Sequence, residues 1–191
     1  MTKTPPIYTS LRGQLLVATP QMDYGQFQQS VIYICQHDGE STMGLIINQQ
    51  IDDLNFGDLA EKLEIGTPRD AADMPLYIGG PVERSRGYIL HSQEQMMPDS
   101  IAVSDDIALS LHLDILQDIA QGIGPSHAKI IIGYAGWSAG QLENELRENM
   151  WFHIPATPQM VFSEDSSTLW DMAFKLAGLD AGALSPQTGR A

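Results

Sequence analysis

The stretch IIGYAGWSAGQLENELRENMW, which runs from Ile131 to Trp151, decides the fold class because a strand pattern passes directly into a helix pattern. Its first residues are largely apolar, which is typical of a buried strand. Its second half places Leu142 and Leu146 four residues apart among charged residues, which indicates an amphipathic helix. The segment between them fits G-x-S-x-G, the nucleophile elbow of hydrolases, which also joins a strand to a helix. Ser138 is therefore either a nucleophile or the cap of a helix.

The sequence around Ser138 favours the cap. A nucleophilic serine needs a histidine and an acid, and in the fold that uses this elbow both follow the serine. Only His153 lies downstream of Ser138, and no strand between them could bring its side chain back over the elbow. Ser138 and Gln141 instead fit the capping box S-x-x-Q. In that box the serine hydroxyl accepts from the Gln141 amide, and the Gln141 side chain reaches back to the serine backbone. We predict a helix cap at Ser138 and no catalytic residue.

The rest of the chain contains several short strands followed by alternating helices and strands. We expect strands over residues 13–18, 30–37, 43–49, 76–81, 87–91, 129–137 and 159–162, and one or two more within residues 100–113. We expect helices over residues 55–66, 114–122, 141–149 and 167–178. Asn55 is expected to cap the first helix. The strand–helix–strand unit from Ile107 to Tyr134 could supply one right-handed parallel crossover. This order predicts an α+β fold: a mixed, strand-rich, barrel-like sheet core flanked by about four helices.

The chain length of 191 residues suits one domain, and a hydrophobic content of 43% allows a sizeable core. We expect an N-terminal arm over residues 1–10, a single domain over residues 11–179 and a flexible tail over residues 180–191. No apolar run approaches the ~20 residues that span a bilayer, so we expect no membrane association. The first ten residues lack the apolar segment of a secretory signal, which predicts a cytoplasmic protein.

The charge balance argues against direct binding of nucleic acid. Ten Lys and Arg residues stand against 24 Asp and Glu residues, which gives a formal net charge of −14. Affinity for nucleic acid comes largely from clustered basic side chains that neutralise phosphates. Here the basic residues are scattered, and only Arg84 and Arg86 stand close together. We therefore expect no direct contact with DNA or RNA.

Metal and redox chemistry have little support in the sequence. Cys35 is the only cysteine, which excludes an internal disulfide and a cysteine-rich zinc site. It ends an apolar strand run, which favours a buried, inert thiol. The five histidines show no spacing typical of metal ligands. We predict no metal site and no cofactor.

Four motifs occur in a fixed order along the chain: QLLVATPQM, SVIYICQHDGESTMGLIINQ, YIGGPVERSRGYILH and GYAGWSAGQLENELRENMW. Together they resemble the AlgH/YqgE family of bacterial proteins, and the resemblance extends from about Leu11 to Leu179. It implies an α+β fold with a strand-rich, barrel-like core. Members of that family are commonly described as transcriptional regulators, and the resemblance implies no catalytic residue.

The Gly79-Gly80-Pro81 sequence is the strongest candidate for a binding feature. Paired glycines permit positive φ or the close approach of another backbone, and their amides could cradle an anion. They could equally form a turn that packs against the segment from Gly133 to Gly140, which we favour. The sharper alternative is that the two glycine-rich segments meet to form one small pocket. Its candidate ligand-binding residues are Gly79, Gly80, Pro81, His91, Trp137 and Gln141.

These features predict a non-enzymatic cytoplasmic binding or regulatory module. The negative charge and the absence of a complete catalytic set favour action through a protein partner or a small ligand. The alternative is an enzyme whose site lies in the pocket near Gly79–Pro81, His91 and Trp137. Convergent polar groups and a perturbed titrating residue there would favour the enzyme, whereas an apolar surface would favour a partner protein.

Overall fold

The computed structural model describes residues 9–66 and 70–178. The expected tail over residues 180–191 and most of the expected arm over residues 1–10 lie outside these ranges. The strands are β1 (Gln14–Ala18), β2 (Val31–His37), β3 (Ser41–Ile46), β4 (Gln50–Asn55), β5 (Pro75–Ile78), β6 (Val82–Ser92), β7 (Ile101–Ala102), β8 (Ile107–Ser110), β9 (Ala128–Ser138) and β10 (Trp151–Pro155). The helices are α1 (Phe56–Lys62), α2 (Leu113–Gln121), α3 (Gln141–Arg147), α4 (Pro158–Val161) and α5 (Ser166–Leu176), with one 3-10 turn over Gly25–Phe27.

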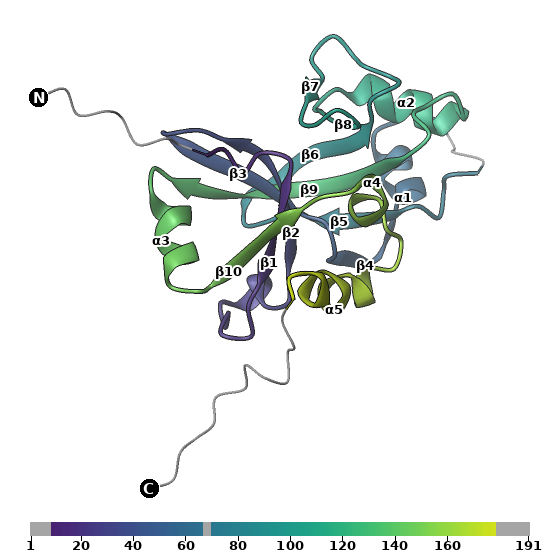
Figure 1. Ribbon diagram of the computed structural model, residues 1–191. Helices are drawn as coiled ribbons and strands as arrows, with labels where there is room; N and C mark the ends of the chain where they lie inside the picture. Colours follow the sequence, from purple (N-terminus) through teal and green to yellow (C-terminus); the bar gives the residue numbers. More distant parts are fainter. Residues whose placement is uncertain (1–8, 67–69, 179–191) are drawn as a thin grey trace, which may run out of the picture.

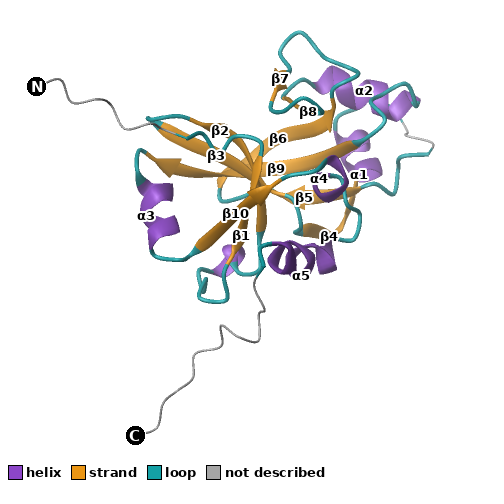
Figure 2. Cartoon of the chain, in the orientation of Figure 1, coloured by secondary structure: helices purple, strands orange, loops and turns teal. Residues whose placement is uncertain are grey.

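All ten strands join one curled, mixed sheet with the helices around its periphery (Figures 1 and 2). The main path is β10-β1-β2-β3-β9-β6-β8-β7, and every neighbouring pair in it is antiparallel. Strand β5 joins β9 in parallel, and β4 adds to β5 in the antiparallel direction. The predicted α+β class with a mixed, strand-rich, barrel-like sheet is confirmed.

Strand β9 pairs with three other strands, β3, β5 and β6. Its first part lies between β5 and β6, since Ile132 is opposite Ile78 on one side and Gly87 on the other. Its last part, from Ala135 to Ser138, pairs with β3. The crossover expected between Ile107 and Tyr134 joins two parallel strands that are not neighbours in the sheet. Strands β8 and β9 run parallel because both are antiparallel to β6, but β6 lies between them.

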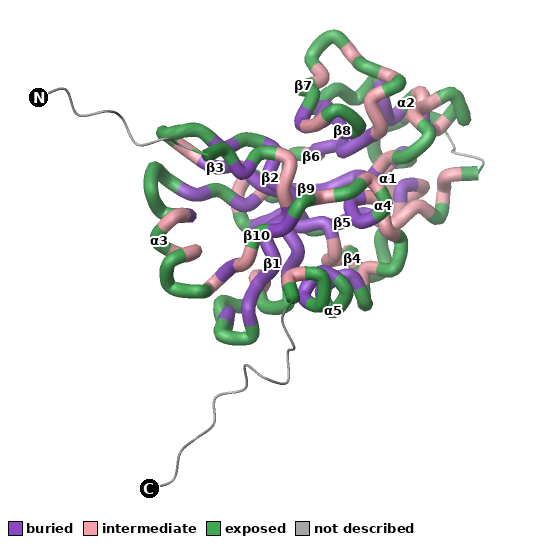
Figure 3. Tube along the Cα trace, in the orientation of Figure 1, coloured by how far each residue is buried: buried purple, intermediate pink, exposed green. Residues whose placement is uncertain are grey.

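The apolar side chains form three buried clusters. Figure 3 shows where buried residues lie along the chain. The largest fills the curl of the sheet beneath α5, the second lies under α3, and the third lies under α1 and α2. Cys35 belongs to the first cluster, and burial raises the pKa of its thiol to about 12. The thiol therefore stays protonated at neutral pH, as the interpretation of a buried, inert cysteine requires.

Helix boundaries follow local capping chemistry. The Asn55 side chain accepts from the Asp58 amide at 3.0 Å, and the Asp58 carboxylate accepts from the Asn55 amide at 2.9 Å. The predicted cap at Asn55 is therefore confirmed. Gly122 ends α2 in the left-handed region with φ of 75°, which suits a residue without Cβ.

The strand predicted over residues 159–162 is wrong. This segment forms α4, because Thr157 caps it through a bond from the Met160 amide and Pro158 stands where no amide donor is needed. The strand in this region is instead β10, which pairs with β1. Of the one or two strands predicted within residues 100–113, the structure has two, β7 and β8. The second ends at Ser110, and Leu113, the last leucine of the alternation, begins α2.

Lys129 of β9 carries a buried amine in the sheet. Its Nζ atom donates to the carbonyl oxygens of Ile47 at 2.9 Å and Ser163 at 3.0 Å, and lies 4.3 Å from the centre of the Tyr77 ring. Burial lowers the pKa of Lys129 to about 7, while the nearby Glu164 carboxylate raises it. The amine thus joins three segments at the cost of a disfavoured charge.

This burial predicts a specific pH dependence of stability. Between about pH 7 and the usual lysine pKa of 10.5, the unfolded chain holds the Lys129 proton and the folded chain does not. The contribution of Lys129 to the free energy of unfolding is therefore lowest below pH 7. It rises with pH above that, by up to about 1.4 kcal/mol per pH unit. The difference in unfolding free energy between wild type and Lys129→Met should grow in favour of wild type from about pH 7 to about pH 9.5. Urea denaturation measures it, with Lys62→Met as the exposed control. Equal pH slopes for the two variants would contradict the account.

Candidate functional site

Glu145 holds α3 against the sheet through two tryptophans. Its Oε2 atom accepts from the indole nitrogens of Trp137 and Trp151, each at 2.8 Å, and its Oε1 atom accepts from the Gln141 side chain at 2.9 Å. The two indole rings meet edge to face with centroids 6.0 Å apart. This group, which we call the tryptophan clasp, ties β9, α3 and β10 together. Two residues of the predicted pocket, Trp137 and Gln141, are therefore engaged in structural bonds.

Ser138 is the last residue of β9. The prediction that it caps α3 is wrong. Its amide donates to Gln141 Oε1 at 3.1 Å, so half of the predicted capping box is present. Its hydroxyl donates to the same oxygen at 3.2 Å instead of accepting from the Gln141 amide. The reason is that Gly140, at φ of 73°, is the N-cap residue and delays the start of the helix. Within the described ranges no histidine bonds to Ser138, and His153 bonds to Gln14 at 2.7 Å.

His37 forms a second link to α3. Its Nδ1 atom accepts from the Leu11 amide at 2.7 Å, so its Nε2 atom carries the proton and donates to Glu143 at 3.0 Å. The ring is buried and joins the start of the domain, β2 and α3. The sequence hides this pair because its members are 106 positions apart.

His91 lies outside the predicted pocket. It sits near the end of β6 opposite Ala128, whereas Val82, at the other end of the same strand, lies opposite Tyr134. Its ring is fully buried, with Nδ1 donating to the Ser92 carbonyl at 3.0 Å and Nε2 accepting from the Ser110 hydroxyl at 2.8 Å. Burial lowers the pKa of His91, so the ring is neutral. The structure thus separates His91 from the other five candidate residues.

Gly79, Gly80 and Pro81 connect β5 to β6 by passing over β9. An added Cβ would lie 2.2 Å from the Gly133 oxygen at Gly79, and 2.2 Å from the Tyr134 carbonyl at Gly80. The Gly79 amide donates to Ile132 at 2.8 Å, so it is not available to an anion. The favoured interpretation, a turn packed on the segment from Gly133 to Gly140, agrees with this geometry.

Immediately after this crossing β6 bulges away from β9. Val82 is opposite Tyr134 and Gly87 is opposite Ile132, so four residues of β6, 83–86, face a single residue of β9. Beside them lies a groove of about 520 Å³, here called the bulge groove. Its apolar lining comes from β3, β6, β7, β8 and β9 and from the residue after β8: Met43, Tyr88, Ile101, Leu109, Leu111 and Tyr134. Trp137 also lines it, so this groove contains one of the six predicted residues and begins one residue after Pro81.

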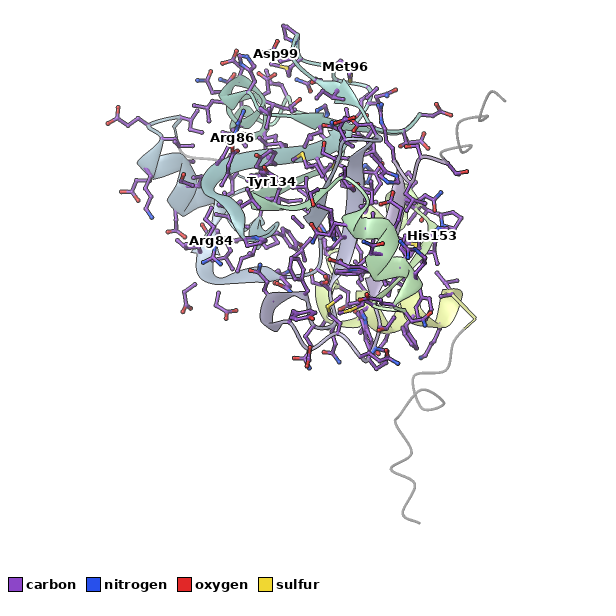
Figure 4. All side chains as sticks on the ribbon, turned by 90° about the vertical axis from the view of Figure 1, so that its left-hand side faces the viewer. Arg84, Arg86, Met96, Asp99, Tyr134 and His153 are labelled. Atoms are coloured by element: carbon purple, nitrogen blue, oxygen red, sulfur yellow. The ribbon has the colours of Figure 1, made fainter. Side chains whose placement is uncertain are left out.

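A charged rim borders the bulge groove. The Glu83 carboxylate accepts from the Tyr88 hydroxyl at 2.8 Å and from Arg86 at 3.2 Å, and the bond from Tyr88 is the main cause that lowers the pKa of Glu83. Burial and the same bond raise the pKa of Tyr88. The rings of Tyr88 and Tyr134 meet edge to face at 5.7 Å. Figure 4 places Arg84, Arg86 and Tyr134 on one side of the molecule, well away from His153.

The lining of the bulge groove is rich in apolar and aromatic side chains. No residue that lines it is a histidine or cysteine, and the carboxylate in its lining, that of Glu83, is bonded to Tyr88 and Arg86. The serine–histidine pair of Ser110 and His91 is buried, with both side chains closed to solvent. Over residues 9–66 and 70–178 there is no group of three or more His, Cys, Asp and Glu residues that could hold a metal ion. In the same ranges no helix has the length and hydropathy needed to cross a membrane.

Comparison with known proteins agrees with the fold. The model of a family described as AlgH-like matches residues 15–182. The chain belongs to the AlgH-like family. A UPF0301 protein of Nitrobacter hamburgensis is 41% identical over 97% of this chain and 90% of its own length. One from Mesorhizobium japonicum is 44% identical over 95% of this chain and 93% of its own.

Two solved structures resemble this AlgH-like chain. The solution structure of the AlgH protein from Pseudomonas aeruginosa matches with a TM-score of 0.77 and 34% identity over the full length of both chains. An X-ray structure of a Corynebacterium diphtheriae protein matches with a TM-score of 0.71 over 92% of this chain and 90% of the other. Its identity is 23%, so it supports the fold alone. The names of these relatives state no activity.

The tryptophan clasp predicts a stability defect without a change of fold. In Glu145→Gln the amide group accepts at only one of its two positions, so at least one of the bonds from Trp137, Trp151 and Gln141 loses its acceptor. We expect a loss of about 1–3 kcal/mol in unfolding free energy. Denaturation followed by tryptophan fluorescence measures it, with the exposed Glu148→Gln as control. Equal stability of the two variants would show that the clasp contributes nothing.

Proposed function

We propose that this AlgH-like protein is a non-enzymatic binding module whose ligand occupies the bulge groove. The observation that supports this proposal is an apolar and aromatic groove with a charged rim and no histidine or cysteine in its lining. Ligand sites are commonly concave, mostly apolar and supplied with a few polar groups that fix orientation. In the proposal Trp137 contacts the ligand, Gly79, Gly80 and Pro81 shape the bulge, and His91 and Gln141 act structurally.

The same surface suits regulation through a bound partner or small ligand better than direct contact with nucleic acid. Lys129, one of the ten basic residues, is buried inside the sheet and cannot meet a phosphate. Arg84 and Arg86 stand on the bulge, and two guanidinium groups are far fewer than the 6–10 phosphate contacts of a typical DNA-binding protein. We propose a cytoplasmic regulatory role without direct DNA binding.

The proposal predicts where a small aromatic carboxylate binds. Phenylacetate, a ring with one negative charge, should shift the amide signals of Tyr134 and Gly136 in two-dimensional NMR, with an affinity on the order of 1 mM. Leu111→Glu places a carboxylate in the groove and should abolish these shifts. Leu113→Glu, two residues further on and outside the groove, is the matched control. Shifts elsewhere, or equal shifts in both variants, would refute the groove as the binding site.

A further inference from the structure

Beyond Tyr134, one edge of β9 has no neighbouring strand among residues 9–66 and 70–178. Strand β6 leaves β9 at the pair of Val82 and Tyr134, whereas β9 continues to Ser138 beside β3. The Ser138 amide donates to Gln141 and so faces away from β3. Because alternate residues of an antiparallel strand face the same side, the amide and carbonyl of Gly136 also face away from β3. Gly136 is exposed, lines the bulge groove and pairs with no strand on this side among the described residues.

Charged side chains lie on the bulge and in the turn next to Ser41. Arg84 and Arg86 project from the bulge (Figure 4), and within the described ranges Arg84 makes no hydrogen bond or ion pair. Arg86 donates to Glu83 through one guanidinium nitrogen and lies 5.8 Å from the Tyr88 ring centre. Asp38 and Glu40 occupy the β2–β3 turn, next to Ser41 of the lining. The bulge therefore brings two arginines to this part of a chain with a net charge of −14: Arg86, which lines the groove beside Glu83, and the exposed Arg84.

The shape of the groove favours an extended chain over a compact molecule. Ile101 and Leu111 of the lining remain 50% and 36% exposed, so apolar surface continues beyond the groove. A pocket for a small molecule usually encloses most of its ligand, whereas apolar surface of this kind is typical of protein contacts. A free strand edge adds backbone hydrogen bonds, which an extended peptide can use.

We propose that the ligand of the bulge groove is an extended, acidic segment of a partner protein that adds alongside β9 at Gly136. The segment places an apolar side chain between Tyr134 and Leu111 and a carboxylate on Arg84 and Arg86. This inference rests on the proposed function and specifies its partner. Because Gly136 supplies backbone groups at only one position, side-chain contacts give most of the specificity.

The test uses random peptides displayed on phage and selected on the full-length protein. We expect enriched peptides that combine acidic and apolar residues, bind more weakly as salt rises, and shift the Gly136 amide signal. The double variant Arg84→Glu/Arg86→Glu should weaken binding of the synthetic peptides by at least about tenfold. Lys175→Glu, a charge reversal on the exposed face of α5, should leave binding unchanged.

Two results would overturn the inference: no enrichment, or enriched peptides that bind the double variant as tightly as wild type. Phenylacetate binding separates this failure from failure of the proposed function. If phenylacetate shifts the amide signals of Tyr134 and Gly136 and no peptide is enriched, the groove binds small ligands. In that case only the peptide inference fails. If neither probe binds the groove, both proposals fail.

Discussion

Backbone lies directly on backbone where residues 79–81 pass over β9, and the arrangement of the sheet depends on that contact. Strands β5 and β6 flank β9 on opposite sides, so their three-residue connection must cross it. The crossing leaves no space for a side chain at Gly79 or Gly80. Gly133 beneath them has φ of 74°, and a Cβ there would lie 2.8 Å from the Gly80 oxygen. Three glycines therefore allow two strands to enclose a third.

The crossing has consequences on both sides of β9. Because the connection is short, β6 re-enters the sheet out of register, and residues 83–86 form the bulge that borders the groove. Beyond the bulge β9 loses one neighbour, and its final residues carry the tryptophan clasp that fixes α3 and β10. The candidate binding surface and the tryptophan clasp thus lie next to each other on β9, beside the glycine crossing.

The sequence predicts the elements with strong patterns and fails where distant residues decide the structure. Asn55 and Asp58 form the expected cap because both partners lie within four residues. Ser138 misleads, since the capping box has the right spacing but the left-handed Gly140 shifts the helix start. The adjacent glycines at 79 and 80 suggest the close contact of Gly79 with Gly133. No local sequence pattern indicates the register of β6 on β9, which places His91 far from Trp137. The rim of the groove could have been suspected from Arg84 and Arg86, the one close pair of basic residues.

The most direct test of this account is the unfolding free energy of Gly80→Ala compared with Gly39→Ala. A Cβ at Gly80 meets backbone atoms that cannot move aside, whereas nothing lies within 4 Å of a Cβ at Gly39 in the β2–β3 turn. We predict that Gly80→Ala loses more than about 3 kcal/mol or fails to fold, beyond the usual cost of overpacking. Gly39→Ala should stay within about 1 kcal/mol of wild type. Urea denaturation that finds equal stability for the two variants would contradict the claim that this crossing organises the fold.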